Sequence, residues 1–287
     1  SSGGETGTDG NAESTTRGEP TTTESSSTVE PTTQAADSST TTSGEPDPFC
    51  GDGNIDPGEE CDDGLDDNGL DQSCLPDCNL NVCGDGNLGP DETCDEGADD
   101  NVVEIGACAP DCSGVIEERR IRLGGFSSGN LGVNPIASAD ASCLPGYKAL
   151  LSVPGQRQAT ATAYRADALM DWPLAPYTAY VNEDDSLIWI TDATPLLGVR
   201  DERPHELLAP VVPPCTGFGC LSFFAVSGLR PDWRNSLQNC GVWTSNADTL
   251  SLAAGDPYST RDYLDDSDFA TSCEVPSPFT NVYCVEQ

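Results

Sequence analysis

The sequence lacks several features that mark common classes of enzyme and metalloprotein. It has one histidine, His205, and no Cys-x-x-Cys pair, so it offers none of the ligand sets that zinc sites normally use. A Gly-x-Ser-x-Gly motif, a His-Glu-x-x-His motif, a phosphate-binding loop and a dinucleotide-binding motif are absent as well. No apolar run approaches the roughly 18 residues that a membrane helix requires. These absences predict a protein that is not an enzyme and has no transmembrane helix.

Basic residues are scarce and unevenly placed. The net charge is −37, from 49 acidic and 12 basic residues, and residues 48–114 hold 19 acids and no base. Such a surface repels phosphate, so we expect no nucleic-acid partner. The chain starts at Ser1 without methionine or an apolar leader, and we expect a processed or truncated form. Membrane contact is then expected only through a lipid anchor on a cysteine upstream of Ser1.

Cysteine, in contrast, is abundant. There are 14 cysteines, eight before residue 113 and six after residue 142, an even number in each block. This usage is typical of disulfide-bonded extracellular proteins and argues against the cytoplasm. The first block contains Cys50, Cys61, Cys74, Cys78, Cys83, Cys94, Cys108 and Cys112, and the second contains Cys143, Cys215, Cys220, Cys240, Cys273 and Cys284.

The first segment, residues 1–47, has the composition of a disordered linker. It contains 22 serines and threonines, with glycine, proline and glutamate and almost nothing apolar. A segment of this kind cannot bury enough apolar surface to offset the entropy lost on ordering. A bare linker is the preferred interpretation, and an O-glycosylated stalk is the alternative.

Residues 48–114 contain the same four-cysteine motif twice. The first copy has 10, 12 and 3 residues between its successive cysteines, and the second has 10, 13 and 3. Both copies begin with CGDGN and end with LPDC or APDC. Each repeat is too small for a hydrophobic core and must depend on its disulfides. Four cysteines allow three pairings, and the spacing does not choose among them.

Residues 115–287 form the one segment with enough apolar residues for a sizeable core. Short apolar runs separated by proline, glycine, aspartate and asparagine predict strands. These runs are EERRIRL, YKALLSV, YTAYV, SLIWIT, LSFFAV, GVWTS and NVYCVEQ. Helices are expected only near IASADASC and over QATATAYRADALMDW. The predicted fold class is therefore α+β, rich in short antiparallel strands.

Carboxylates are the densest chemical groups of the two repeats. Calcium takes roughly six to eight oxygen ligands, and carboxylates suit it, so calcium is the one cofactor that the sequence suggests. The alternative is that aspartate, asparagine and glycine serve tight turns, and neither copy matches the EF-hand pattern. Both interpretations stay open. The candidate ligands are Asp52, Asp62, Asp63, Asp66, Asp67, Asp71, Asp85, Asp95, Glu96, Asp99 and Asp100.

Two resemblances to known families follow from these motifs. CGDGN, DPGEECDDG and CLPDC make residues 49–113 similar to the myxobacterial-type disulfide-rich repeat, which occurs in tandem on bacterial surface proteins. The C-terminal region is similar to the endostatin-like branch of the C-type lectin-like fold, as found in uncharacterised bacterial surface lipoproteins. That similarity rests on GNLGVNPIASADASCLPGYKALLS, AYVNEDDSLIW, VWTSNAD and TSCEVPSPFTNVYCVEQ, whereas residues 200–239 diverge.

The second resemblance implies disulfide pairings. Cys143 is expected to bond Cys284 and so to tie the ends of the domain together. The family bond to the cysteine of the TSC segment, Cys273, has Cys240 as its best candidate partner here, although the position differs from the family's. Cys215 and Cys220 are then left to pair locally.

The motifs through which C-type lectins bind sugar are missing. EPN, QPD and WND do not occur, and VWTSNAD matches the last of them only in part. Trp243 is expected to pack in the core, with Asn246 and Asp248 in the following turn. Arg119, Arg120 and Arg122 are expected on a solvated strand rather than in a glycan site. The acidic loops 182–185 and 262–268 are the expected ligand-binding places, because loops on a rigid scaffold carry binding.

The sequence thus predicts three domains, namely residues 1–47, 48–114 and 115–287. The expected protein stands on the extracellular or bacterial outer-membrane surface and functions in recognition or adhesion. Its expected partner is an extracellular glycan or protein, or a second copy of itself. The alternative function is a structural subunit of a surface coat or extracellular fibre.

Overall fold

The structure is a computed structural model that describes residues 49–125, 130–213, 224–245, 251–252, 254–264, 271–273 and 280–287. By its contacts the chain divides into two units, Ser1–Pro46 and Asp47–Gln287. The expected linker, residues 1–47, lies outside the described residues. All described residues therefore belong to the second unit. None of the described helices is long and apolar enough to cross a bilayer.

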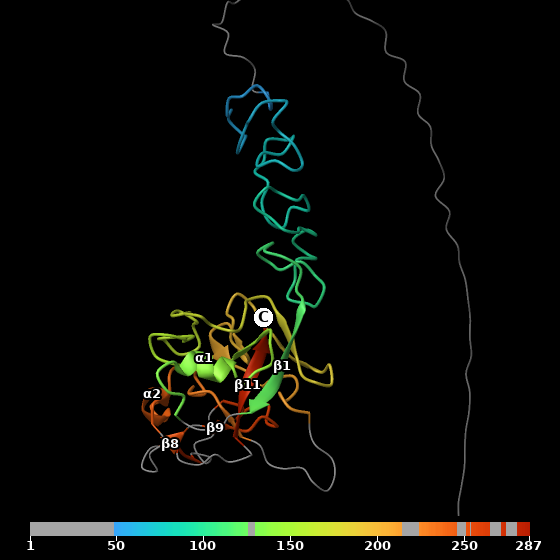
Figure 1. Ribbon diagram of the computed structural model, residues 1–287. Helices are drawn as coiled ribbons and strands as arrows, with labels where there is room; N and C mark the ends of the chain where they lie inside the picture. The colour runs from blue at the N-terminus through green and yellow to red at the C-terminus, as the bar shows by residue number, and fades with distance from the viewer. Residues whose placement is uncertain are drawn as a thin grey trace, which may run out of the picture. The chain divides into compact units, whose positions relative to one another are not determined.

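The two repeats, coloured from blue to green in Figure 1, carry the same nested pair of disulfides. In the first repeat Cys50–Cys78 encloses Cys61–Cys74, and in the second Cys83–Cys112 encloses Cys94–Cys108. Of the three pairings that the spacing allowed, both copies use first with fourth and second with third. Neither repeat forms a regular strand or helix in the described chain, which has only isolated bridges here. The disulfides thus replace a hydrophobic core.

The first repeat contacts the second through Asn81. The Asn81 amide donates to the carbonyl oxygens of Leu70 and Gln72, at 3.1 and 2.9 Å. Its Oδ1 atom lies beside the buried Gly89, where a Cβ atom would approach it to 3.1 Å. The position equivalent to Gly89 in the first repeat is Asp56, six residues after the first cysteine in each copy. A side chain at this position would crowd Asn81, so glycine suits the place where the two repeats meet.

Short strands dominate the C-terminal region, as the sequence predicts. The strands are β1 (Glu118–Gly125), β2 (Tyr147–Ala149), β3 (Ala179–Val181), β4 (Leu187–Ile190), β5 (Val199–Arg200), β6 (Arg203–Pro204), β7 (Phe224–Val226), β8 (Ser251–Leu252), β9 (Ala254–Gly255), β10 (Thr271–Ser272) and β11 (Thr280–Glu286). The helical elements are α1 (Pro135–Asp140) and α2 (Cys240–Trp243). All six predicted strand runs other than GVWTS contain a strand.

The main sheet has the order β4-β3-β1-β11-β7-β9, and β2 also pairs with β11. β1 runs antiparallel to β11, with Ile121 opposite Val285, and parallel to β3. Because β1 occupies one edge of β11, β7 and β2 share its other edge, at residues 280–282 and 284–286. The last strand of the chain is therefore the centre of the sheet.

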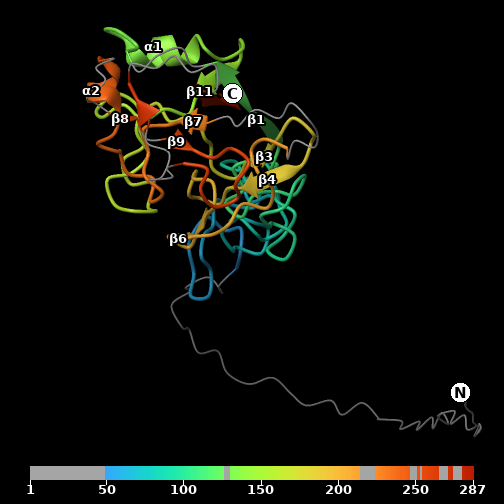
Figure 2. The same cartoon turned by 90° about the horizontal axis from the view of Figure 1, so that it is seen from below.

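Both faces of β11 are buried. Tyr283 and Val285 pack in one hydrophobic cluster, and the alternating residues Val282 and Cys284 pack in another. This two-sided burial explains why NVYCVEQ reads as a nearly continuous apolar run. α1 belongs to the second cluster through Ala139, and lies along one side of the sheet in Figure 2.

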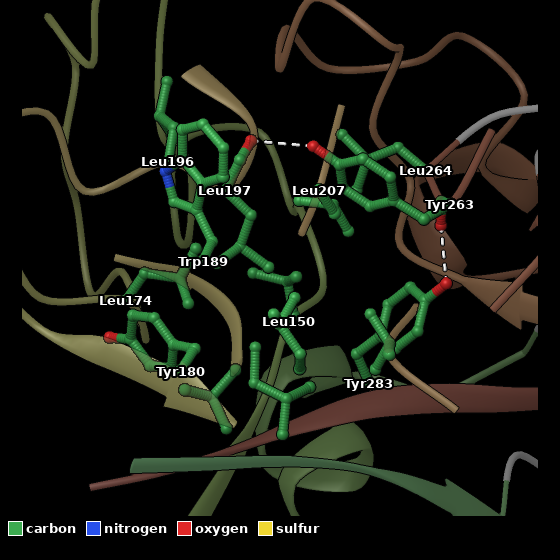
Figure 3. Close-up of a cluster of buried hydrophobic side chains, with 14 of the residues drawn as sticks. Leu150, Leu174, Tyr180, Trp189, Leu196, Leu197, Leu207, Tyr263, Leu264 and Tyr283 are labelled. Carbon is green, nitrogen blue, oxygen red and sulfur yellow. Dashed lines mark hydrogen bonds between the residues drawn. The ribbon is translucent and has the colours of Figure 1, made fainter. Parts of the chain in front are cut away.

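A chain of buried tyrosine hydroxyls crosses the larger cluster (Figure 3). Tyr283 donates to the carbonyl oxygen of Tyr263 at 2.6 Å, and Tyr263 donates to the carbonyl oxygen of Leu197 at 2.7 Å. Burial raises the pKa of both phenols, so they stay protonated donors. These bonds tie the centre of the sheet to segments that no strand of the sheet provides.

The short helix near IASADASC is confirmed as α1. Asn134 caps it by accepting from the Ala137 amide at 3.3 Å, and Pro135 follows at the first helical position. The second predicted helix, over residues 158–172, is wrong. There Asp167 accepts from the Thr160 hydroxyl and from two backbone amides, which competes with helical hydrogen bonding.

The strand predicted at GVWTS is also wrong. Cys240, Gly241, Val242 and Trp243 all have φ between 54° and 64°, so α2 is a single left-handed turn. The Asn239 side chain accepts from the Val242 amide at 3.0 Å, and the Cys240–Cys273 disulfide fixes the start of the turn. Local capping and a crosslink thus outweigh the strand propensity of valine and tryptophan. Trp243 is buried as expected and donates to the Ser152 carbonyl at 2.8 Å.

The structure contains both long-range disulfides that the endostatin-like resemblance implied, Cys143–Cys284 and Cys240–Cys273. β1 passes directly over the first of them at Gly124, where a Cβ atom would come within 2.5 Å of the Cys284 sulfur. The proposed Cys215–Cys220 pair lies outside the described residues.

The second repeat continues directly into β1 and packs against the sheet. Ala109, Ile116 and Ala179 form a small buried cluster, and the Ala179 amide donates to the Glu117 carbonyl at 3.0 Å. Ile116 also exchanges backbone hydrogen bonds with Gly106 and Ala107, each of 2.9 Å. Repeat and sheet thus share one apolar contact centred on Ile116.

Replacing Ile116 with alanine is expected to loosen this contact. The side chain is 1% exposed, and such a deletion in a packed site costs about 3 kcal/mol. Hydrogen exchange at the Ala107 and Ile116 amides measures the loss. Val115→Ala is the control, because Val115 is 50% exposed. Equal protection of these amides in both variants would contradict the role given to Ile116.

Candidate functional site

The predicted ligand loop at residues 182–185 is a fixed turn between β3 and β4. Asn182 is 1% exposed, and its Oδ1 atom accepts from the amides of Asp184 and Ser186, both at 3.0 Å. Its Nδ2 atom donates to the Pro210 carbonyl at 3.2 Å. An asparagine that bonds the backbone ahead of it is a standard device for tight turns. The loop is therefore held in shape before any ligand arrives.

Two arginines of β1 reach this loop. Arg122 donates to Glu183 through Nη2 at 2.6 Å and Nε at 3.2 Å, and Arg120 pairs with Asp185 and donates to the Asn182 carbonyl. Residues 120 and 122 lie on the same face of β1, since side chains alternate along a strand. The hydrogen bond and charge of Asp185 raise the pKa of Arg120. Two of the three acids of the loop, Glu183 and Asp185, are thus paired within the protein.

A groove borders the Arg122–Glu183 pair, and we call it the β1 groove. It consists of two adjoining hollows, of about 210 and 490 Å³, that share Arg122, Leu123 and Glu183. The smaller hollow is walled by residues 211–213 and Asn281. The larger hollow is lined by Gly124, Gly125 and the Cys143–Cys284 disulfide, among others. The loop at residues 182–185, predicted as a binding place, therefore forms one side of the β1 groove through Glu183.

The chemistry of the β1 groove suits binding. Leu123, Val211 and Val212 give it apolar surface, while Asn281 and the Arg122–Glu183 pair give it hydrogen-bonding groups. Among its described residues Glu183 is the one carboxylate. Sequence reasoning missed its apolar and glycine positions, for which the Gly124–Gly125 pair at the end of a strand was the available signal.

The other expected binding places are only partly described. Asp262 lies in a turn in which its amide donates to the Ser259 hydroxyl oxygen at 2.9 Å. Residues 265–268 of that loop, and Asn246 and Asp248, lie outside the described residues. His205 stacks its ring on Trp189, with 6.2 Å between the ring centroids.

Asp62 and Asp95 hold the same turn in the two repeats. Asp62 Oδ2 accepts from the amides of Gly51, Asp52 and Gly53, at 2.9 to 3.1 Å, and Oδ1 accepts from Gly64 at 2.8 Å. Asp95 accepts from the four equivalent amides of the second repeat. Asn68 and Asn101 donate to the same carboxylates, at 3.4 and 3.0 Å. These bonds use the lone pairs that a metal would need.

These hydrogen bonds govern the ionisation of both acids. Desolvation raises the pKa of Asp62, but the hydrogen bonds from Gly64, Gly51, Gly53 and Asn68 together outweigh it, and the net pKa is lowered. The same balance lowers the pKa of Asp95. Because the folded-state pKa lies below the unfolded one, each carboxylate stabilises the fold above pH 3.8, its ordinary value, and loses that effect as the pH falls through the folded-state pKa.

Asp62→Asn is expected to open the turn at neutral pH. The new amide group would face amide donors, so exchange of the Gly51, Asp52 and Gly53 amides should accelerate by about tenfold. The measurement is hydrogen exchange of the full chain. Asp63→Asn is the matched control, because Asp63 is exposed and accepts one 3.4 Å bond from Ser73. If the exchange rates of these amides in Asp62→Asn equalled those of the wild type, the structural role given to Asp62 would be contradicted.

The remaining predicted calcium ligands are exposed. Asp52 and Asp85 each accept from an asparagine two residues on, at 2.8 and 2.7 Å, as turn residues do. Glu96, Asp99 and Asp100 line one open hollow of about 520 Å³ together with Glu104, which the sequence analysis did not name. Asp63, Asp66, Asp67 and Asp71 lie on the surface of the first repeat.

The described residues bring together only two groups with ligand atoms at metal-binding separation. They are Cys50, Glu59 and Cys78, and Cys83, Glu92 and Cys112, whose ligand atoms lie within 4.8 Å of one another. In both groups the cysteines are disulfide-bonded and offer no thiolate. None of the predicted calcium ligands belongs to either group. The calcium site stays a prediction.

Comparison with known proteins gives one finding. Residues 124–259 match the model of a family described as a protein of unknown function (DUF1554). No curated protein matches the chain. The matched segment begins within β1 and includes α1, the 182–185 loop and α2. The family description assigns no activity.

Proposed function

With a DUF1554 domain at residues 124–259 and two disulfide-stapled repeats before it as the starting point, we propose that this is an extracellular cell-surface recognition or adhesion protein. Its binding part is a C-type lectin-like, endostatin-like domain. The observation that carries the proposal is the β1 groove, bordered by a turn that internal hydrogen bonds already fix. A preformed loop spends little conformational entropy when a ligand binds.

The disulfides support an extracellular location. Six bonds join 12 of the 14 cysteines, and no described cysteine is free. Such bonds persist in oxidising compartments and are rare in the cytosol. We expect thiol labelling of the protein from acid-quenched cells to find no free cysteine. Extensive labelling of cysteine thiols would contradict the proposed extracellular location.

The Arg122–Glu183 pair supports recognition of a polar ligand. Its side chains are 30% and 55% exposed, so a hydroxyl-rich ligand can reach both charges. Hydrogen bonds to charged groups are the stronger ones, and the neighbouring Leu123 offers an apolar surface to a sugar ring or a side chain. An extracellular glycan or protein is therefore the proposed partner.

A glycan and protein array tests the proposal with the full chain, in calcium and in chelator. We expect saturable binding of at least one class of ligand, lost in Arg122→Ala and kept in Arg165→Ala. Arg165 is the matched control, because it also forms an exposed ion pair, with Glu202, but does not line the groove. If binding survives in Arg122→Ala, the ligand does not bind in the β1 groove. If the wild-type chain binds no ligand, the proposed recognition function is contradicted. Dependence on calcium would support calcium as a cofactor.

A further inference from the structure

One edge of β1 is unpaired over the second half of the strand. β1 lies between β11 and β3, but β3 pairs only with residues 118–120, and the chain then turns at residues 182–185 into β4. In the described chain residues 121–125 therefore have β11 on one side and no strand on the other. This free edge lies in the β1 groove, whose lining includes residues 122–125.

The free edge offers backbone hydrogen-bonding groups. The Glu117 carbonyl accepts from a β3 amide at 3.0 Å, whereas the Arg120 amide donates to the Glu286 side chain of β11 at 2.9 Å. Because backbone groups alternate between the two edges of a strand, those of Leu123 and Gly125 point away from β11. No other described residue forms a hydrogen bond with them on that edge. Open groups at a sheet edge are a template for pairing with another strand.

The two hollows of the β1 groove lie on opposite faces of the sheet. Leu123 and Val211 of the smaller hollow pack with the cluster that contains Tyr283 of β11. Cys143 and Cys284 of the larger hollow pack in the cluster on the other face. Since side chains alternate along a strand, a strand added to β1 would place successive side chains in one hollow and then the other. Backbone pairing with pockets for alternate side chains is how sheet edges bind extended peptides.

The surroundings of the groove favour apolar and basic residues in alternation. The smaller hollow has aliphatic walls, from Leu123, Val211 and Val212 among others. Charged residues within two positions of the groove's lining are mostly acids, namely Asp140, Glu183, Asp184, Asp185 and Glu286, against Arg120 and Arg122. Even without Asp140, which Arg157 binds, acids outnumber arginines by four to two. The net charge of −37 adds an attraction for basic partners at longer range.

We propose that a protein segment with apolar and basic residues in alternation binds as an added strand at the free edge of β1. Its backbone pairs with Leu123 and Gly125, and its apolar side chain enters the smaller hollow. Its basic side chain faces Glu183, which is 55% exposed and borders both hollows. The inference rests on the proposed recognition function and narrows the ligand to a polypeptide. The acidic charge opposes a second copy of this chain as the occupant.

A capped peptide of about six residues, with valine and lysine in alternation, tests the proposal on the full chain. We expect saturable binding by calorimetry. Hydrogen exchange of the Leu123 and Gly125 amides should slow about tenfold at saturation, whereas the Gly124 amide, which faces β11, should not change. A peptide of the same composition, with its valines and lysines in two blocks, is the control and should bind about tenfold more weakly.

A proline at position 125 blocks the edge with little effect on the fold. Gly125→Pro removes one outward N–H, and a Cβ atom at this position meets nothing within 4 Å. We expect the variant to bind the alternating peptide about tenfold more weakly. Gly125→Ala is the matched control, because it adds a side chain but keeps the N–H. Thermal unfolding verifies that both variants are folded, and the exchange measurement on the wild type requires neither of them.

The outcomes separate this proposal from ligand recognition in general. If the alternating peptide does not bind, or binds without slowing exchange at Leu123 and Gly125, strand addition is contradicted. Full-strength peptide binding by a folded Gly125→Pro chain contradicts it as well. A glycan that binds Gly125→Pro but not Arg122→Ala would overturn strand addition and leave recognition by the β1 groove intact. Protection of the two amides that rises with protein concentration in the absence of peptide would assign the edge to a second copy of this chain.

Discussion

Removal of the Cys143–Cys284 disulfide, by replacing both cysteines with alanine, is expected to lower the free energy of unfolding by about 4 to 5 kcal/mol. The bond joins residues 141 positions apart, and the loop-closure entropy of the unfolded chain grows with that separation. Since Cys284 lies on the central strand, its release also leaves a gap beneath Gly124. Denaturant unfolding of the oxidised full chain, followed by tryptophan fluorescence, measures the effect, because all four tryptophans lie in the C-terminal region.

The Cys240–Cys273 bond provides the comparison. It spans 33 positions, so the same model gives about 3.5 kcal/mol for its removal. The expected order is therefore a larger loss for the longer loop. A reversed order would show that the packing around each bond outweighs the entropy of the unfolded chain.

Replacing Arg157 with alanine is expected to destabilise the C-terminal region by about 3 kcal/mol. The Arg157 side chain is 1% exposed, donates to both carboxylate oxygens of Asp140 at 2.7 and 2.9 Å, and also donates to Asp171 at 2.6 Å. Truncating one member of a buried ion pair typically costs roughly 3 to 5 kcal/mol. The lower figure applies because Asp140 and Asp171 are 27% and 39% exposed and can be rehydrated.

Arg165→Ala is the control for the arginine variant. Its ion pair with Glu202 is more than half exposed on both sides, and a loss below about 0.5 kcal/mol is expected. Thermal or denaturant unfolding compares the two variants directly. If both variants had equally small effects, Arg157 would not act as the buried clamp between α1 and the segment that follows β2.

The sequence was most informative where a residue pattern has one physical meaning. Alternation in EERRIRL and the apolar run in NVYCVEQ predicted β1 and β11, because a half-buried and a fully buried strand leave different signatures. Repeated cysteine spacing predicted the repeats but could not select their pairing. That choice depends on contacts between separate segments: Asp62 binds the turn that follows Cys50, and the Cys78 carbonyl accepts from the amides of Glu60 and Cys61.

The two wrong secondary-structure predictions, at residues 158–172 and at α2, share a cause that the sequence pattern does not reveal. At residues 158–172 the alanines favour a helix, but Asp167 captures backbone amides that a helix would use. At α2 the Cys240–Cys273 bond and the Asn239 side chain hold a left-handed turn against the preference of valine. Both outcomes depend on a single side chain or bond with a specific partner in space.

The candidate site, too, depends on contacts between residues that are distant in sequence. The loop at 182–185 was predicted as a binding place from its exposed acids, and it does border the β1 groove. Two of its three acids, Glu183 and Asp185, are engaged by Arg122 and Arg120, which alternation along β1 places on one side. The apolar and glycine residues of the groove come from segments far apart in sequence, so no local motif could have marked them.

The contact between Asn81 and Gly89 has a consequence for how such arrays grow by gene duplication. A repeat that follows another fits best with glycine at the Gly89 position, because a Cβ atom there would crowd Asn81. The first repeat has Asp56 there, so it is suited to begin an array but not to be inserted within one. A copy of the second repeat, placed after itself, would supply its own glycine but would present Ile116 where Asn81 now lies, because the Ile116 amide donates to Ala107 as the Asn81 amide donates to Ser73. Duplication of either repeat therefore leaves one unsuitable residue at the new junction, Asp56 for the first repeat and Ile116 for the second.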